Sequence, residues 1–303
     1  MRAEALDKYA ELLEQNRAQA MAMCIREAGK TIPDALAEVR EAVDFARYYA
    51  QRARIDFTAP IRLPGPTGED NTIALASRGV FACISPWNFS LAIFSGQVLA
   101  ALAAGNAVIA KSAEQTPLVA AFAVRLMYQA GIPADVLHFL PGSGASVGAA
   151  LTGAEGIAGV AFTGSVETAR LIAKSLAAKP GPLAPVIAEI GGQNVMIVDS
   201  SALLEQAVAD ALTSAFSSAG QRCSCLRVVF VQEEIAAAFI AKLDGALQEI
   251  EVGDPLLLAT DVGPLIDADA LDVMRARSDV ARRCADGKRY RVRFLFFAAS
   301  FRN

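Results

Sequence analysis

The sequence predicts an α/β protein, with a Rossmann-like parallel sheet covered by helices on both faces and a partial second α/β domain. Two patterns carry this prediction. Short apolar runs alternate with segments of helical periodicity, and these runs are continuous, as is typical of parallel strands buried on both faces. With 303 residues, 54% of them hydrophobic, the chain is long enough to bury a large core in about two domains.

The N-terminal part predicts helices. Residues 2–54 alternate apolar and charged positions at helical spacing, with a break at Gly29 and at residues 31–34, so two helices are expected. A connector rich in Pro and Gly follows at 59–71. Together with the Rossmann-like part over 72–190, these helices make up a predicted nucleotide-binding domain over residues 1–190.

The Rossmann-like part predicts five strands separated by helices, and ligands of such sheets bind at the carboxyl ends of the strands. The expected strands are 80–85, 107–112, 136–141, 159–165 and 185–190, and the expected helices are 91–104, 116–130, 145–152 and 166–178. The second domain is expected over 191–274, with strands at 194–199 and 227–232 and helices at 201–219 and 233–250.

The end of the chain differs in composition from the rest. Residues 275–303 hold nine Lys or Arg against two Asp, although the whole chain has a net charge of −4. No regular structure is expected after about Met274, and residues 280–303 show neither helical nor strand periodicity. We therefore treat 275–303 as a basic tail outside the second domain.

Charge and cysteine content restrict the class of protein. A mildly acidic body gives no reason to expect nucleic acid as a partner. Residues 79–110 carry no charge, but Pro86, Asn88, Gln97 and Gly105 interrupt them, so buried strands and a helix are favoured over a membrane span.

The first 30 residues lack a secretory signal, and the five irregularly spaced cysteines argue for a reducing compartment. A cytoplasmic location is expected.

Cys223 is a candidate nucleophile. It follows "AGQR" in a loop between a helix and a strand, where a substrate could reach the thiol. The alternative is a small buried hydrophobic residue. No metal is expected, because the Cys-x-Cys spacing lacks a second Cys/His pair. The single histidine, His138, lies in an apolar strand and is expected to be structural, so activation would come from a carboxylate, a cofactor or backbone dipoles.

Two further residues fit chemistry at a carbonyl. Glu189 ends an apolar strand and precedes two glycines; burial there would raise its pKa and suit a general base. The alternative is a surface ion pair. Asn88, in "SPWNFS", could donate to an oxyanion, or it could cap the following helix.

The nucleotide signals are separately weak. "PGSGASVG" at 141–148 is rich in glycine but lacks the dinucleotide fingerprint. "FTGS", which contains Gly164 and Ser165, joins a strand to a helix, where free N–H groups favour phosphate. Lys111 and Glu114 leave a strand end together and could hold ribose hydroxyls, with the carboxylate favouring NAD over NADP. A solvated ion pair is the alternative.

Five motifs in the same order resemble the aldehyde dehydrogenase superfamily: PWNF, AKxAEQTP, FTGS, ExGG and GQRC. The resemblance covers roughly residues 5–272. Longer stretches, such as "REAGKTIPDALAEVREAVDFARYYA" and "SAFSSAGQRCS", are most similar to the L-glutamate γ-semialdehyde (1-pyrroline-5-carboxylate) dehydrogenase modules of proline utilization A proteins.

The resemblance implies NAD-dependent oxidation of L-glutamate γ-semialdehyde to L-glutamate through a cysteine thioester. Cys223 would be the nucleophile, Asn88 with the Cys223 N–H would bind the oxyanion, and Glu189 would activate water. The implied cofactor contacts are Lys111, Glu114, Gly164, Ser165 and Trp87, and Ser224 would help bind the substrate carboxylate. Cys225 would be a packed neighbour.

The resemblance also has limits. The family's later E-I-F-G-P motif is absent, so the catalytic domain is expected to be about half complete. An inactive remnant that at most binds nucleotide is therefore the alternative function. The family implies an oligomeric parent protein, and the subfamily implies a proline dehydrogenase domain in the parent polypeptide.

Overall fold

A computed structural model describes residues 1–285, and its centre is a five-stranded parallel sheet. The strand order is β5-β4-β3-β6-β7, and every pairing is parallel. The strands are β3 (Val80–Ile84), β4 (Ala107–Lys111), β5 (Leu137–Phe139), β6 (Ile157–Gly164) and β7 (Val186–Ile190). All five expected strands are confirmed, with shifts of up to two residues at their ends.

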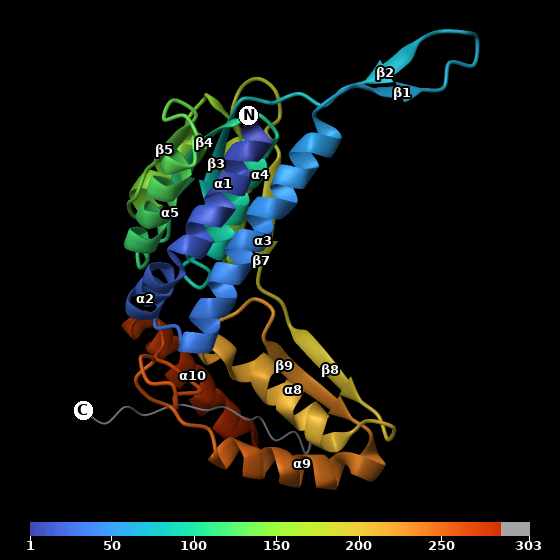
Figure 1. Ribbon diagram of the computed structural model, residues 1–303. Helices are drawn as coiled ribbons and strands as arrows, with labels where there is room; N and C mark the ends of the chain where they lie inside the picture. The colour runs from blue at the N-terminus through green and yellow to red at the C-terminus, as the bar shows by residue number, and fades with distance from the viewer. Residues whose placement is uncertain (286–303) are drawn as a thin grey trace.

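Helices cover both faces of this sheet. One face is covered by α4 (Ala92–Ala103) and α5 (Pro117–Gln129). The helices α1 (Arg2–Gln15), α2 (Arg17–Ala28) and α3 (Ile32–Asp56) pack on α4 and α5 as an outer layer, which Figure 1 shows in front of the strands. The other face meets α6 (Ala149–Gly153) and α7 (Val166–Ala177). Side chains alternate between the faces, because Phe81 and Cys83 join the first core whereas Ala82 and Ile84 join the second.

The N-terminal layer contains three helices, so the expectation of two is wrong. The additional break lies at Asn16, whose side-chain amide donates to the Leu12 carbonyl at 2.8 Å. Such a local bond competes with helix continuation. The expected break near Gly29 is confirmed: Gly29 ends α2 in the left-handed conformation (φ 65°), and Thr31 caps α3 by accepting from Asp34 N–H.

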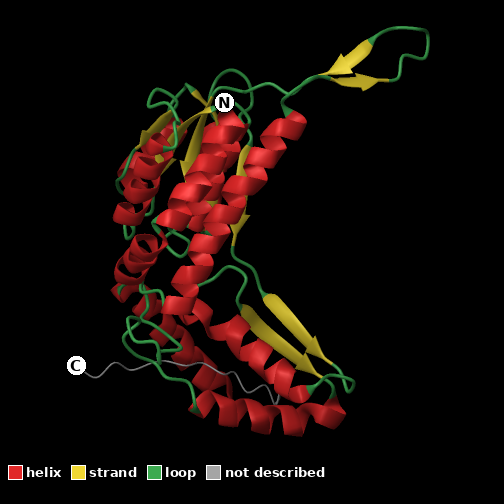
Figure 2. Cartoon of the chain, viewed as in Figure 1, coloured by secondary structure: helices red, strands yellow, loops and turns green. Residues whose placement is uncertain are grey.

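A second unit lies below the main sheet in the view of Figure 2. It pairs β8 (Asn194–Val198) with β9 (Leu226–Val231) in parallel and packs them on α8 (Leu204–Phe216) and α9 (Glu233–Gln248). Between α8 and β9 lies η2 (Ser217–Gly220), a 3-10 turn. The opposite face of β8 and β9 leaves large apolar side chains exposed, including Ile197 and Phe230.

Helical structure continues beyond Met274, contrary to expectation. Helix α10 spans Ala268–Ala285, and its acidic Asp269 lies in the first turn, where the helix dipole favours negative charge. Residues 286–303 of the predicted basic tail lie outside the described residues. The remaining elements are the π-helical turn η1 (Gly144–Gly148) and the hairpin of β1 (Ile61–Leu63) and β2 (Asn71–Ile73), which projects from the body in Figure 1. Within residues 1–285, no helix has the length and apolarity needed to span a membrane.

We expect Gly159→Ala to lower the free energy of unfolding by about 1–3 kcal/mol. Gly159 pairs with Phe81 across β6 and β3, and an added Cβ would overlap the Phe81 ring. The control is Gly156→Ala, because no atom lies within 4 Å of a Cβ at that position. Urea unfolding of both variants measures the difference, and equal midpoints would contradict the packing described here.

Candidate active site

The carboxyl ends of three neighbouring strands form one edge of the main sheet. Register pairs Ile84 of β3 with Lys111 of β4 on one side and with Phe162 of β6 on the other. The loop after β3, which holds Trp87, therefore begins beside Lys111 and close to Gly164, the last residue of β6. This is the edge at which parallel α/β sheets bind ligands.

Lys111 is the buried cation of this edge. Its side chain is 4% exposed, and its Nζ donates to the Ser112 carbonyl at 2.9 Å. Burial lowers the Lys111 pKa, and the nearby charge of exposed Glu114 partly offsets that effect by raising it. The glycine-rich turn η1 lies beside it, because a Cβ at Gly148 would be 3.7 Å from Lys111 Cε. The sequence signals at 111–114 and 141–148 therefore converge in space.

The "FTGS" motif forms a helix start. Ser165 is the N-cap of α7: its hydroxyl oxygen accepts from Thr168 N–H at 3.1 Å and its hydroxyl lies 3.0 Å from Thr168 Oγ1. Gly164 approaches the Phe162 ring closely, since a Cβ there would lie 2.6 Å from Phe162 Cζ. The N–H groups of the first turn of α7 lie at the sheet edge, where they favour an anion.

The cysteine loop, residues 217–225 between α8 and β9, presents one thiol and buries another. Cys223 is exposed, whereas the Cys225 side chain is 1% exposed, as expected for a packed neighbour. Asn194, at the start of β8, donates its side-chain amide to the Cys223 carbonyl at 2.7 Å and to the Cys225 carbonyl at 2.8 Å. Sequence analysis did not predict a role for Asn194. Its position directly after Gly191-Gly192-Gln193, at the start of a strand, is a signal that could have indicated one.

Asn88 connects the loop after β3 to the cysteine loop. Its Nδ2 donates to the Gln221 carbonyl at 2.7 Å, two residues before Cys223. The alternative role as a helix cap is wrong, because the N-cap of α4 is Leu91 and no side chain caps that helix. A side-chain amide has two N–H bonds, so one remains for another acceptor.

Glu189 lies on β7, opposite Thr163 of β6, and its side chain is exposed. Of the two interpretations, burial is therefore wrong, and none of the ion pairs among the described residues includes Glu189. Glu189 is exposed because β7 is the edge strand of the sheet, and four of its five residues are exposed within the described part of the chain. No described hydrogen bond joins Glu189 to Asn88 or Cys223, but the chain continues directly from it to Asn194, which holds the Cys223 carbonyl.

His138 lies on β5 with its side chain exposed. Residues 1–285 contain no group of three or more His, Cys, Asp or Glu arranged to hold a metal ion.

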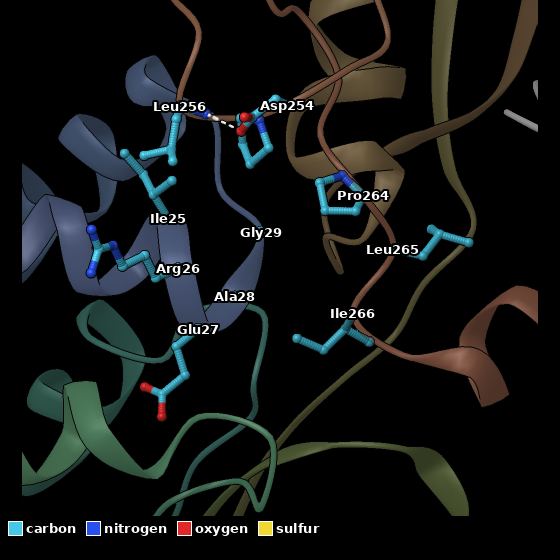
Figure 3. A pocket seen from close by; sticks show the side chains of 11 residues that line it. Ile25, Arg26, Glu27, Ala28, Gly29, Asp254, Leu256, Pro264, Leu265 and Ile266 are labelled. Carbon is cyan, nitrogen blue, oxygen red and sulfur yellow. Dashed lines mark hydrogen bonds between the residues drawn. The ribbon is translucent and has the colours of Figure 1, made fainter. Parts of the chain in front are cut away.

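A pocket of about 310 Å³ lies between residues 25–29 and the loop that contains 254–256 and 264–266. Figure 3 shows Glu27 at this pocket, but both of its carboxylate oxygens accept from N–H groups at the start of α5.

Comparison with known proteins agrees with these features. The sequence model of the aldehyde dehydrogenase family matches residues 1–288. The match extends beyond residue 272, where the resemblance noted from the sequence motifs ends. The bifunctional protein PutA of Klebsiella aerogenes is 52% identical over 272 residues, which are 89% of this chain and 20% of that protein. The 1-pyrroline-5-carboxylate dehydrogenase of Anoxybacillus flavithermus is 35% identical over 286 residues, which are 93% of this chain and 55% of that protein.

The fold agrees as well. A solved structure of proline utilization A (PutA), with proline bound in remote sites, superposes with a TM-score of 0.90 and 53% identity. The superposition covers 93% of this chain and 29% of that chain. The chain thus spans about half the length of the 1-pyrroline-5-carboxylate dehydrogenase relative and a fifth of PutA.

We expect Asn194→Ala to speed alkylation of Cys225 by iodoacetamide, because two hydrogen bonds that hold the cysteine loop are lost. Loss of such bonds costs about 1–3 kcal/mol of local stability. Because iodoacetamide reacts with the open form of the loop, the population of that form and the alkylation rate should rise roughly 5- to 150-fold. Peptide mapping separates Cys223 from Cys225. Asn71→Ala in the distant β1–β2 hairpin is the control, and an unchanged Cys225 rate in Asn194→Ala would contradict the role of Asn194.

Proposed function

The chain belongs to the aldehyde dehydrogenase family, and we propose that it carries the nucleophile and the dinucleotide site of an enzyme that oxidises L-glutamate γ-semialdehyde to L-glutamate. One observation carries the proposal: Asn88, at the ligand-binding edge of the sheet, hydrogen-bonds the loop that presents the exposed Cys223. The substrate follows from the similarity to PutA and to 1-pyrroline-5-carboxylate dehydrogenase.

The first step is addition of the Cys223 thiolate to the aldehyde carbon. A carbon–sulfur bond forms, the carbonyl π-electrons move to oxygen, and an oxyanion results. The remaining N–H of Asn88 and the backbone N–H of Cys223 are the donors that would stabilise it, and each such donor is worth about 100- to 1000-fold in rate. Ser224, exposed beside the nucleophile, would bind the substrate carboxylate.

The residues at the sheet edge fit a nicotinamide dinucleotide. The buried Lys111 ammonium uses one N–H for Ser112 and keeps two for ribose hydroxyls, with Glu114 nearby. Gly164 and Ser165 would place the N-terminus of α7 against the pyrophosphate. Half-buried Trp87 lies in the loop after β3, the strand between β4 and β6. Bound NAD would supply the acceptor for the hydride that leaves the tetrahedral carbon, which makes Cys223 a thioester.

The last step is hydrolysis of the thioester. Glu189 would take a proton from water as the water oxygen bonds to the acyl carbon. The carbon–sulfur bond then breaks, and the Cys223 thiolate and the carboxylic acid result. The approach of Glu189 is supported by its place on β7, from which the chain leads directly to Asn194 and the cysteine loop.

A second candidate function is nucleotide binding without turnover. The observation that favours it is the exposure of Glu189 together with the apolar face of β8 and β9, because a water-excluding catalytic site needs these surfaces covered. In either case we propose a nucleotide-binding domain over 1–190 and a partial catalytic domain over 191–274. We further propose a cytoplasmic, oligomeric parent protein that includes a proline dehydrogenase domain.

We expect Cys223→Ala to abolish NADH formation from L-glutamate γ-semialdehyde, because no other described thiol is exposed. NADH is followed by its absorbance, and NAD binding by calorimetry. Cys225→Ala is the matched control and keeps activity, since that thiol is buried and donates to the Ser217 carbonyl at 4.0 Å. Turnover that persists in Cys223→Ala would contradict the nucleophile. NAD binding without any turnover in the unmodified chain would favour the second function.

We expect Lys111→Met to weaken NAD binding about 10- to 100-fold, which corresponds to the loss of charged hydrogen bonds to ribose. The free energy of unfolding should not fall, because burial of the ammonium is unfavourable, as its lowered pKa indicates. Lys242→Met, at an exposed lysine, is the control. A destabilised variant with unchanged NAD affinity would instead assign Lys111 a structural role.

A further inference from the structure

A buried ion pair lies between the N-terminal helices and the sheet edge. Lys30 and Glu38 are 3% and 1% exposed, and Lys30 Nζ is 3.6 Å from Glu38 Oε2. Glu38 Oε1 accepts from Leu91 N–H at 2.7 Å and from Ala92 N–H at 3.4 Å, at the start of α4. Glu38 Oε2 has no hydrogen bond within the described residues, so Lys30 is what compensates it. Burial raises the Glu38 pKa, and the Lys30 charge opposes this effect.

The same ammonium reaches the cysteine loop. Lys30 Nζ donates to Ser218 Oγ at 3.0 Å, and the Ser218 N–H donates to Asp34 Oδ2 at 2.8 Å. Ser218 and Ala219 both have left-handed backbones, with φ of 53° and 55°. This conformation is unfavourable for residues other than glycine and persists only where surrounding contacts hold it. Lys30 and Asp34 supply such contacts.

Lys30 also contacts the other half of the site through Phe89, the residue after Asn88. Its Nζ lies 4.6 Å from the centre of the Phe89 ring, and the Arg222 guanidinium carbon lies 5.2 Å from the same centre. Arg222 directly precedes Cys223. The cation–π contacts therefore join the residue after the oxyanion donor to the residue before the nucleophile.

We propose that Lys30 is a positioning residue, which holds the Asn88–Phe89 segment and the Ser218–Cys223 segment in one relative arrangement. The catalytic meaning of this arrangement rests on the proposed function. Lys30 contacts both segments and the carboxylate that holds the start of α4. Its removal leaves a buried carboxylate without a counter-charge and a left-handed turn without one of its donors, and both effects loosen the site at once.

Hydrogen exchange of the full chain tests this role without requiring turnover. In Lys30→Met, amides of residues 88–92 and 217–223 should exchange about 2- to 30-fold faster, the range typical of coupling between packed segments. The emission of Trp87, the only tryptophan, should shift as well. Lys30→Arg should restore both signals, because the charge returns, and Lys8→Met, at an exposed lysine of α1, should leave both unchanged.

A second variant keeps the test decisive if Lys30→Met does not fold. Ser218→Ala removes only the hydroxyl acceptor and leaves Glu38 paired, and it should speed exchange of residues 217–223. Unchanged exchange in Ser218→Ala, or equal acceleration across the whole sheet in Lys30→Met, overturns the proposal. Where the unmodified chain turns over aldehyde, Lys30→Met should lower kcat by up to about 100-fold and change KM less. Faster local exchange in a chain that forms no NADH from the aldehyde, not even one equivalent, would uphold the positioning role and reject the proposed function.

Discussion

The site depends on the parallel alignment of β4, β3 and β6. Because these strands point the same way and pair in register, their carboxyl ends meet at one edge, although other elements separate them along the chain. Lys111, the loop with Trp87 and Asn88, and the N-cap Ser165 are together for this reason alone. Parallel strands require crossover helices, and those helices supply the two apolar layers that bury the sheet.

Polar contacts, more than apolar ones, connect this edge to the cysteine loop. The bonds from Asn88 to Gln221, from Lys30 to Ser218 and from Ser218 to Asp34 all run between the N-terminal third of the chain and residues 218–221. Buried charges of this kind seldom add net stability, since desolvation offsets their attraction. Their effect is geometric: a charge-paired, hydrogen-bonded group tolerates few alternative positions, so the loop that presents Cys223 is fixed in orientation as well as in place.

Sequence patterns predicted the sheet well because fully buried strands are continuous apolar runs. The exposed Cys223 was also predictable, since it follows a glycine between a helix and a strand. Other features depend on tertiary contacts that no short pattern encodes. The exposure of Glu189 follows from the edge position of β7, and the break at Asn16 follows from one side-chain bond. Glu38 left a weak signal, because it occupies a position on the buried stripe of α3 otherwise filled by Ala35, Val39 and Ala42.

The two halves of the proposed reaction place different demands on this chain. Addition to the aldehyde needs the Cys223 thiol and the donors around it, which the polar network holds firmly. Hydrolysis needs Glu189 in a site from which bulk water is excluded, and within residues 1–285 that side chain is open to solvent. The outer face of β8 and β9, with Ile197 77% and Phe230 57% exposed, is apolar enough to favour a covering layer at roughly 25 cal/mol per Å² buried. Such a layer would stabilise the second unit. In the proposed reaction, acyl-enzyme formation therefore draws on groups that the described contacts hold in place, whereas hydrolysis also needs Glu189 to be shielded from bulk water.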